Sequence, residues 1–238
     1  MALKIICHMI TTLDSRIVTS RWDLGPDADI GPLYENTAQK FDAQGWIVGR
    51  TTMAEYADNI DEHAPALSET KIRQSWRGAY REGMMLAIVF DLKGKLTYEG
   101  CTLPTGEHLV AVLSSAVSDD YLHALQEQGI SYVFAGDGED DEQIGPALAS
   151  IQELFPHVHT LLLEGGGTIN GAFLKSKLID EISLIVCPLL DGSAKVQNFM
   201  DYHGEADPRP GAGQKLELIE KETLAGGVLY LRYAVDRE

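Results

Sequence analysis

The chain has 238 residues, 45% hydrophobic and 23% charged, which is typical of a globular protein rather than a disordered or fibrous one. A formal net charge of −17 and a pI near 4.7 argue against nucleic acid as a partner, because the overall field repels phosphate backbones. No stretch approaches the roughly 20 apolar residues of a membrane span and the start has no signal-peptide pattern, so we expect a soluble, cytoplasmic protein without a membrane partner.

Three cysteines, Cys7, Cys101 and Cys187, are far apart in the chain and form no C-x-x-C pair. An odd number at such spacing argues against a disulfide framework and against a cysteine-ligated zinc ion. Cys7 and Cys187 lie in apolar runs, where free cysteine usually behaves as a small buried hydrophobe. We expect no metal site.

The first part of the chain alternates strands and helices. An apolar run at 3–10 predicts a buried strand, and the Gly/Pro/Asp-rich stretch 20–32 predicts a loop. Residues 33–45 have helical spacing with Gly45 as the stop, 46–49 form a short strand, and Thr51 and Thr52 resemble caps of the helix that follows.

The pattern is hard to interpret between 60 and 107, apart from a strand at 85–91, and is regular afterwards. Strands are predicted at 108–114, 130–136, 159–166 and 180–190, and helices at 118–129, 140–155 and 168–177. Two alternating runs, 215–224 and 227–236, predict a C-terminal antiparallel hairpin. The intervening stretch 191–213 is long enough to indicate a loop with a function or an oligomer contact.

This alternation predicts an α/β fold, a three-layer α/β/α sandwich whose central sheet is mostly parallel and carries a C-terminal antiparallel hairpin. One domain spanning 1–238 is expected. In such a sheet the chemistry gathers at the carboxyl ends of the strands, where helix N-termini point free N–H groups outward. The turns at this edge are 11–16, 49–52, 114–115, 135–136 and 164–170.

These turns are rich in Gly, Ser and Thr, which suits a phosphorylated ligand held by backbone N–H groups and hydroxyls. The run Gly165, Gly166 and Gly167, followed by Thr168, is the most specific. A phosphate could sit on the helix N-terminus there with no Cβ in the way; alternatively, the glycines form a tight turn that needs positive φ. Neither G-x-G-x-x-G nor a P-loop motif is present at this position.

Three segments in order, "MITTLDSRI", "WIVGRTT" and "TLLLEGGGTINGAFLKSKLIDEISLIVCPLLDG", resemble the reductase domain of the riboflavin-biosynthesis deaminase-reductases, which has a dihydrofolate reductase-like fold. The resemblance spans residues 9 to 192. It implies a reductase that transfers hydride from NADPH to a small heterocyclic or imine-type substrate, and a homodimer. The similarity is greatest to 5-amino-6-(5-phosphoribosylamino)uracil reductase.

The resemblance also implies site residues. The cofactor pyrophosphate would lie near Gly165, Gly166, Gly167 and Thr168. The turn formed by Gly49, Arg50, Thr51 and Thr52 would also face the phosphate side of the cofactor. Ser114 and Ser115 match positions near the adenosine 2′-phosphate. Glu164 and Asp14 fall where the family borders the nicotinamide and the substrate, and are the catalytic candidates.

Both acids have a second interpretation. Glu164 could stabilise positive charge on a reduced imine, or it could accept hydrogen bonds from the glycine loop and hold its shape. Asp14 before Ser15 is also a good turn former. His8 is expected to be a core residue rather than a general acid.

The chain departs from the family pattern in two ways. The zinc deaminase signature, an H-x-E followed by P-C-x-x-C, is absent because the chain has no P-C-x-x-C, so deamination is excluded. The pyrimidine reductases have a D-x-P-R-L-T-like stretch after the G-x-x-T turn, whereas 53–69 here differs, which leaves the phosphoribosylaminouracil substrate open. Arg73, Arg77 and Arg81 would share one face of a helix and form either a phosphate grip or a solvated basic surface.

Two alternatives to the leading function follow. A dihydrofolate reductase-like pteridine reductase needs an acid on the first helix, and Glu35 is the only candidate there. A sensor protein could instead bind NADPH without turning over a substrate.

Overall fold

The computed structural model describes residues 3–23, 30–60, 73–136, 140–204 and 208–237. The chain divides into two compact units. One is built on Gln44–Leu161, and the other on Lys4–Ala43 with Leu162–Glu238. The single domain expected from the sequence stays a prediction, and each unit is described by itself. No helix within the described part of the chain is long and apolar enough to cross a membrane.

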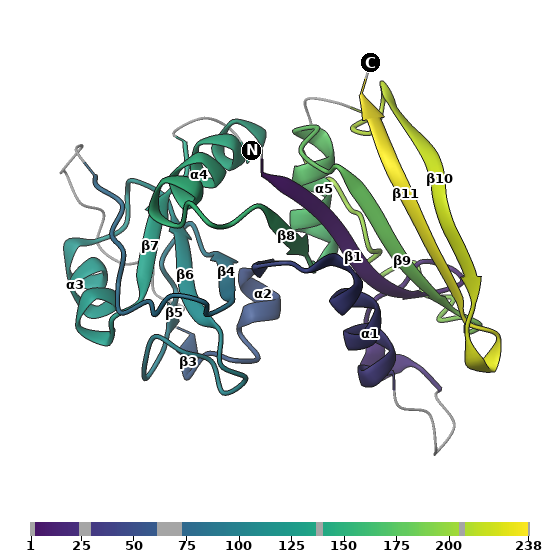
Figure 1. The fold of residues 1–238 in the computed structure, drawn as a ribbon, viewed down its shortest axis with the longest axis horizontal. Coiled ribbons are helices and arrows are strands. Elements are labelled where there is room, and N and C mark those ends of the chain that lie inside the picture. Colours follow the sequence, from purple (N-terminus) through teal and green to yellow (C-terminus); the bar gives the residue numbers. More distant parts are fainter. Residues whose placement is uncertain (1–2, 24–29, 61–72, 137–139, 205–207, 238) are drawn as a thin grey trace. The chain divides into compact units, whose positions relative to one another are not determined.

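The unit built on Gln44–Leu161 contains four parallel strands in the order β2-β4-β6-β7 (Figure 1). The strands are β2 (Gly45–Gly49), β4 (Leu86–Phe90), β6 (His108–Leu113) and β7 (Ser131–Phe134). Every residue of β4 and β6 is buried, as their continuous apolar sequences require. The helices are α2 (Arg50–Met53), α3 (Asp119–Gln128) and α4 (Asp140–Leu154), and β3 (Asn59–Ile60) pairs antiparallel with β5 (Leu96–Thr97).

Helix α3 shows how local sequence sets element ends in this unit. The Ser118 hydroxyl caps its start by accepting a hydrogen bond from the Tyr121 N–H at 3.2 Å. Gly129 ends it in the left-handed region, at φ +74°. Both ends agree with the sequence prediction.

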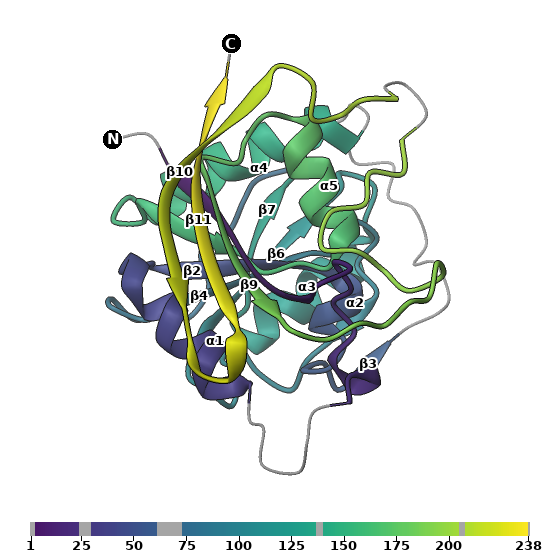
Figure 2. The ribbon, with the colours of Figure 1, turned by 90° about the vertical axis from the view of Figure 1, so that its right-hand side faces the viewer.

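The other unit contains strands in the order β10-β11-β9-β1, with Leu162 and Leu163 of β8 next in the order (Figure 1), and Figure 2 shows β9, β11 and β10 side by side. These are β1 (Lys4–Thr12), β8 (Thr160–Leu163), β9 (Glu181–Cys187), β10 (Gln214–Thr223) and β11 (Leu229–Arg237). Strands β1 and β9 are parallel, whereas β11 runs antiparallel to β9 and to β10. Helix α1 (Gly31–Ala38) follows β1, and α5 (Gly167–Lys175) follows β8. The predicted α/β architecture, mostly parallel with a C-terminal antiparallel hairpin, is confirmed.

Two local predictions are wrong. The first helix ends at Ala38 and is followed by the 3₁₀ turn Gln39–Phe41, so Gly45 is not its stop. Gly45 instead begins β2, where a Cβ would lie 2.6 Å from the Leu86 carbonyl oxygen. Helix α2 spans four residues with Gly49 as its N-cap, and no side chain caps it, so Thr51 and Thr52 are not its caps.

Candidate active site

The glycine loop lies between β8 and α5, as predicted. Gly165 has φ +94°, a conformation that side chains with a Cβ rarely adopt, and the Gly165–Gly166 peptide bond is cis. Helix α5 begins at Gly167 with Gly166 as its N-cap, and no side chain caps this end. The positive-φ turn therefore accounts for Gly165, and the start of α5 presents main-chain N–H groups rather than a capping side chain.

Another part of the chain packs on the next two glycines. A Cβ on Gly166 would lie 2.9 Å from the Gln197 side-chain oxygen, and one on Gly167 would lie 2.0 Å from the Asn198 carbonyl oxygen. One turn later along α5, a Cβ on Gly171 would meet the Asp201 carbonyl group at 2.5 Å. The bare backbone at Gly167 and Gly171 therefore accommodates residues 196–202, called the covering segment below.

Hydrogen bonds fasten the covering segment to α5. The Asp201 N–H donates to the Gly167 carbonyl at 3.0 Å, and the Asn170 side-chain amide donates to the Phe199 carbonyl at 2.7 Å. The Gln197 amide donates to the Thr168 hydroxyl at 3.2 Å. Part of the long loop 191–213, expected to have a function, thus lies against the predicted pyrophosphate loop.

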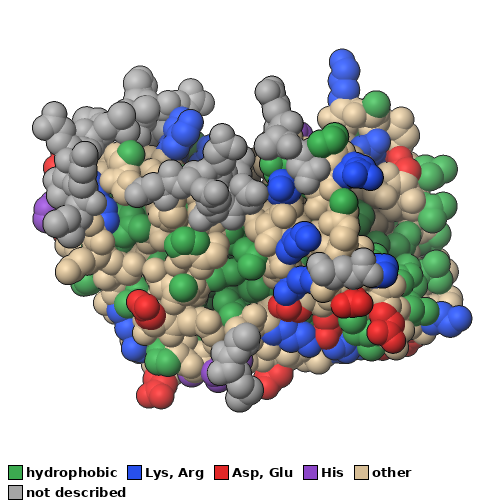
Figure 3. All heavy atoms as spheres, turned by 90° about the horizontal axis from the view of Figure 1, so that it is seen from above, with side chains coloured by type: hydrophobic (Ala, Val, Ile, Leu, Met, Phe, Trp, Pro, Cys, Tyr) green, Lys and Arg blue, Asp and Glu red, His purple; other side chains and the backbone are tan. Residues whose placement is uncertain are grey.

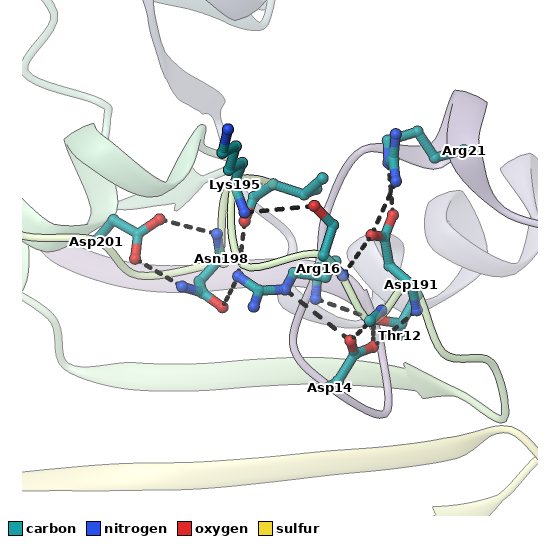
Figure 4. A network of polar contacts seen from close by, with 11 residues as sticks. Thr12, Asp14, Arg16, Arg21, Asp191, Lys195, Asn198 and Asp201 are labelled. Carbon is teal, nitrogen blue, oxygen red and sulfur yellow. Dashed lines mark hydrogen bonds and ion pairs between the residues drawn. The ribbon is translucent and has the colours of Figure 1, made fainter.

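Asp14 organises the turn after β1 (Figure 4). It accepts hydrogen bonds from the Thr12 hydroxyl at 2.6 Å and from the N–H groups of Asp191 and Gly192 at 3.1 and 2.8 Å. These donors, with the Thr12 hydroxyl contributing most, lower the pKa of Asp14 to about 2. Ser15 has φ +70°, as a tight turn requires. Such contacts favour the turn-forming interpretation of Asp14 over direct catalysis.

Arg16 joins this turn to the covering segment (Figure 4). Its guanidinium donates to the Val196 carbonyl at 2.6 Å and to the Asn198 side-chain oxygen at 2.8 Å. Asn198 in turn donates from its N–H and its amide to the Asp201 carboxylate, both at 2.8 Å. The turn after β1, the covering segment and α5 therefore form one connected polar network. No motif or spacing in the sequence indicated these roles of Arg16 and Asn198.

Glu164 directly follows β8 and is half-buried. Its carboxyl group lies within hydrogen-bonding reach of the Tyr34 hydroxyl, which comes from α1. Glu35, the acid considered for a pteridine reductase, is exposed on the same helix. Tyr34 was missed in the sequence because an aromatic residue on an amphipathic helix is normally a core residue.

The remaining predicted residues lie in the unit built on Gln44–Leu161. Gly49 is the last residue of β2, and Arg50, Thr51 and Thr52 follow it. Ser114 and Ser115 follow the carboxyl end of β6, and β4 lies between the two strands. At the end of β4, the buried Asp91 accepts hydrogen bonds from the N–H groups of Lys95 and Leu96. Asp91 thus orders the turn between these two sets.

The helix that would place Arg73, Arg77 and Arg81 on one face is not present in the described part of the structure. Lys71 and Ile72, which precede Arg73, lie outside the described residues. Residues 73–81 are not helical. The Arg73 guanidinium donates to the carbonyls of Ser115 at 3.0 Å and Val117 at 2.7 Å and pairs with Asp119, whereas Arg77 lies over the Tyr80 ring at 4.8 Å. Arg73 therefore braces the loop after β6, where Ser114 and Ser115 lie, and is not a free phosphate ligand.

The start of α5 fits a phosphate group. Its first-turn N–H groups and the Thr168 hydroxyl are donors at the positive end of the helix dipole, and Gly166 meets only the flexible end of Gln197. No group of three or more metal-ligating side chains occurs among the described residues. The donor set is that of an anion site beside a carboxyl group, Glu164.

Known proteins share the family and the fold of this chain. A family model described as the RibD C-terminal domain matches residues 3–230. Among solved structures, a pyrimidine reductase-like protein from Corynebacterium diphtheriae is 14% identical with a TM-score of 0.67, and the match covers 99% of this chain and 93% of that one. The riboflavin biosynthesis reductase Rib7 of Saccharomyces cerevisiae is 12% identical with a TM-score of 0.59, covering 99% and 90%.

Acinetobacter baumannii RibD is 14% identical with a TM-score of 0.61, and the match covers 99% of this chain but 58% of RibD. At these identities the solved structures establish the fold, which is that of the RibD and dihydrofolate reductase-like reductases. The family comprises NAD(P)H-dependent reductases and generally uses NADPH. Because the family model matches nearly the whole length, the chain belongs to the RibD C-terminal domain family.

Proposed function

We propose that the protein is an NADPH-dependent reductase that transfers hydride to a small heterocyclic or imine-type substrate. The observation that carries the proposal is the uncapped start of α5, placed directly after Glu164 in a chain that the family model covers from residue 3 to 230. We further propose that the substrate resembles 5-amino-6-(5-phosphoribosylamino)uracil, the substrate of the reductase to which the sequence motifs are most similar.

Each set of residues has a separate task in this proposal. The N–H groups of Gly167 and Thr168 and the Thr168 hydroxyl would hold the pyrophosphate. Gly49 to Thr52 and Ser114 with Ser115, in the unit built on Gln44–Leu161, stay cofactor-binding predictions from the family resemblance. NADPH itself supplies the hydride, so the protein needs to orient it and exclude water.

Glu164 is proposed as the catalytic carboxyl group, stabilising positive charge that develops on an imine nitrogen. Asp14 is proposed to act indirectly, because its oxygens already accept three hydrogen bonds that fix the turn beside Arg16. A carboxylate occupied in this way holds the turn and the start of the loop 191–213 in position and does not need to touch substrate.

The proposal is tested by mixing the purified full chain with NADPH and following the loss of reduced nicotinamide absorbance with pyrimidine, pterin and flavin substrates. Oxidation with a pyrimidine substrate supports the proposal, and oxidation with a pterin alone favours the pteridine reductase alternative. Saturable NADPH binding without oxidation of any substrate favours the sensor alternative.

We also propose a homodimer, formed by the outer face of the β10–β11 hairpin. Leu216 and Leu218 on β10 pair with Val235 and Tyr233 on β11, so the four share a face. Leu216 and Leu218 are 52% and 46% exposed, although they are large apolar residues. Hydrophobic side chains gather at the right edge of Figure 3, over this hairpin. Strand β10 is also an edge strand.

If this face joins two copies, Leu218→Lys should convert the dimer to a monomer, because burying an unpaired ammonium group costs several kcal/mol. Light scattering of the eluting protein measures the mass. The control is Glu217→Lys, on the opposite face of the same strand, which should leave the dimer intact. A wild-type monomer, or a Leu218→Lys dimer of unchanged affinity, contradicts the proposal.

A further inference from the structure

Tyr34 on α1 is held on two sides by His8 of β1. Its hydroxyl donates to the His8 carbonyl oxygen at 2.9 Å, and the two rings lie 4.4 Å apart between centroids. The Nε2 atom of His8 is 3.3 Å from the Tyr34 carbonyl oxygen. With both its backbone and its ring in contact with His8, the Tyr34 hydroxyl has little freedom to move.

His8 is itself fixed. It is fully buried, and its Nδ1 atom lies 2.9 Å from the Ser183 hydroxyl on β9. Burial lowers the pKa of His8 to about 4, so the ring is neutral at neutral pH. The His8 ring that packs against Tyr34 is therefore held in place, and it carries no positive charge that would compete with the Tyr34 hydroxyl for the Glu164 carboxylate.

The Tyr34 hydroxyl also contacts the Glu164 carboxyl group. Its ionisable neighbours are Glu164 after β8, Cys7 on β1 and Glu35 on α1. Burial first, and then the charge of Glu164, raise the pKa of Tyr34 well above its usual value. The phenol therefore keeps its one proton and shares it between two acceptors, the His8 carbonyl oxygen and the Glu164 carboxylate, of which the charged carboxylate is the stronger.

We propose that Tyr34 is a positioning residue that acts through Glu164, holding the carboxyl group in one orientation and stabilising its ionised form. The inference deepens the proposed function, because it rests on Glu164 being the carboxyl group beside the reacting carbon. A hydrogen bond to an ionised group is stronger than one to a neutral group, so the phenol favours the carboxylate over the acid.

The test is the protonation equilibrium of Glu164 itself, measured by ¹³C NMR of protein labelled at the glutamate carboxyl carbon. The Glu164 signal is identified by its loss in Glu164→Gln. In Tyr34→Phe the titration midpoint should rise by about one pH unit, a tenfold shift. The matched control is Tyr98→Phe, which removes another buried tyrosine hydroxyl, one with no hydrogen-bond partner among the described residues. It should leave the midpoint unchanged.

A midpoint that is the same in Tyr34→Phe and wild type overturns the proposal. If Tyr34→Phe does not fold, as judged by circular dichroism, the hydroxyl proton resonance of Tyr34 is compared between wild type and Glu164→Gln. It should move upfield in the variant, and an unmoved resonance overturns the proposal. Neither measurement needs turnover or bound NADPH, so failure of the proposed function is seen separately, in the oxidation assay.

Discussion

Acidification from pH 7 to pH 4 is expected to lower the free energy of unfolding by about 3 kcal/mol through His8 alone. The ring is buried between the Ser183 hydroxyl and the Tyr34 carbonyl, and desolvation lowers its pKa from 6.5 to about 4. His108 is also buried, with its pKa lowered to about 4 by burial and by Arg77, and contributes in the same direction.

The sign follows from where the proton binds. Between pH 6.5 and pH 4 the unfolded chain takes up a proton on His8 that the folded protein excludes, so protonation favours unfolding. The loss begins near pH 6.5, grows as the pH falls, and levels off below about 4. Asp14 contributes below this range, because its carboxylate is protonated from near pH 3.8 in the unfolded chain but only near pH 2 in the folded protein.

Urea unfolding at pH 7 and pH 4 measures the effect. His8→Gln retains a polar side chain but has no titrating ring. Its free energy of unfolding should therefore fall by about 3 kcal/mol less between pH 7 and pH 4 than that of wild type. The control is His123→Gln, at an exposed position on α3, which should behave as wild type. Equal losses for wild type and His8→Gln would show that the buried ring is not the cause.

The second large effect is expected from Gly167→Ala. The added methyl group would meet the Asn198 carbonyl oxygen at 2.0 Å, and a backbone oxygen cannot turn away as a side chain can. Relieving the clash would separate the covering segment from α5 and break the hydrogen bond from the Asp201 N–H to the Gly167 carbonyl. We expect a loss of roughly 3 kcal/mol or more in the free energy of unfolding.

Gly171→Ala should be similarly costly, because its methyl group would meet the Asp201 carbonyl group at 2.5 Å. Gly211→Ala is the control. Its methyl group would make an ordinary contact with Leu174 at 3.8 Å, so a change within about 0.5 kcal/mol is expected. Chemical denaturation of the three variants compares them. A nearly neutral Gly167→Ala would mean that the covering segment does not pack on α5 as described.

The sequence predicted the fold best where local pattern and tertiary contacts agree. The apolar runs of β4 and β6 have only one favourable environment, a sheet covered on both faces, and the Ser118 and Gly129 caps define α3 from local chemistry alone. Prediction failed where a tertiary contact decides the outcome. Gly45 looked like a helix stop, but it is needed because the Leu86 backbone approaches it closely.

In the candidate site, too, features visible in the local sequence were predicted, and features that depend on tertiary contacts were not. The glycine loop was predicted because a glycine run between a strand and a helix is visible in the sequence, whereas Glu164 came from the family resemblance, and its catalytic role stays a prediction. The covering segment was visible only as a long loop, since its contacts with Gly167 join residues about 30 positions apart. The arginine spacing was misleading, because Arg73 is used in bracing the loop after β6.

The central claim is that the loop at the start of α5 holds the pyrophosphate of NADPH, and fluorescence titration with NADPH tests it most directly. Wild type should bind saturably, and Gly166→Val should weaken binding at least 100-fold, about 2.7 kcal/mol, while staying folded by circular dichroism. A side chain at 166 displaces Gln197, so Gln197→Ala is the control and should keep nearly full affinity. Absence of saturable binding to wild type, or equal affinity of Gly166→Val and wild type, would contradict the claim.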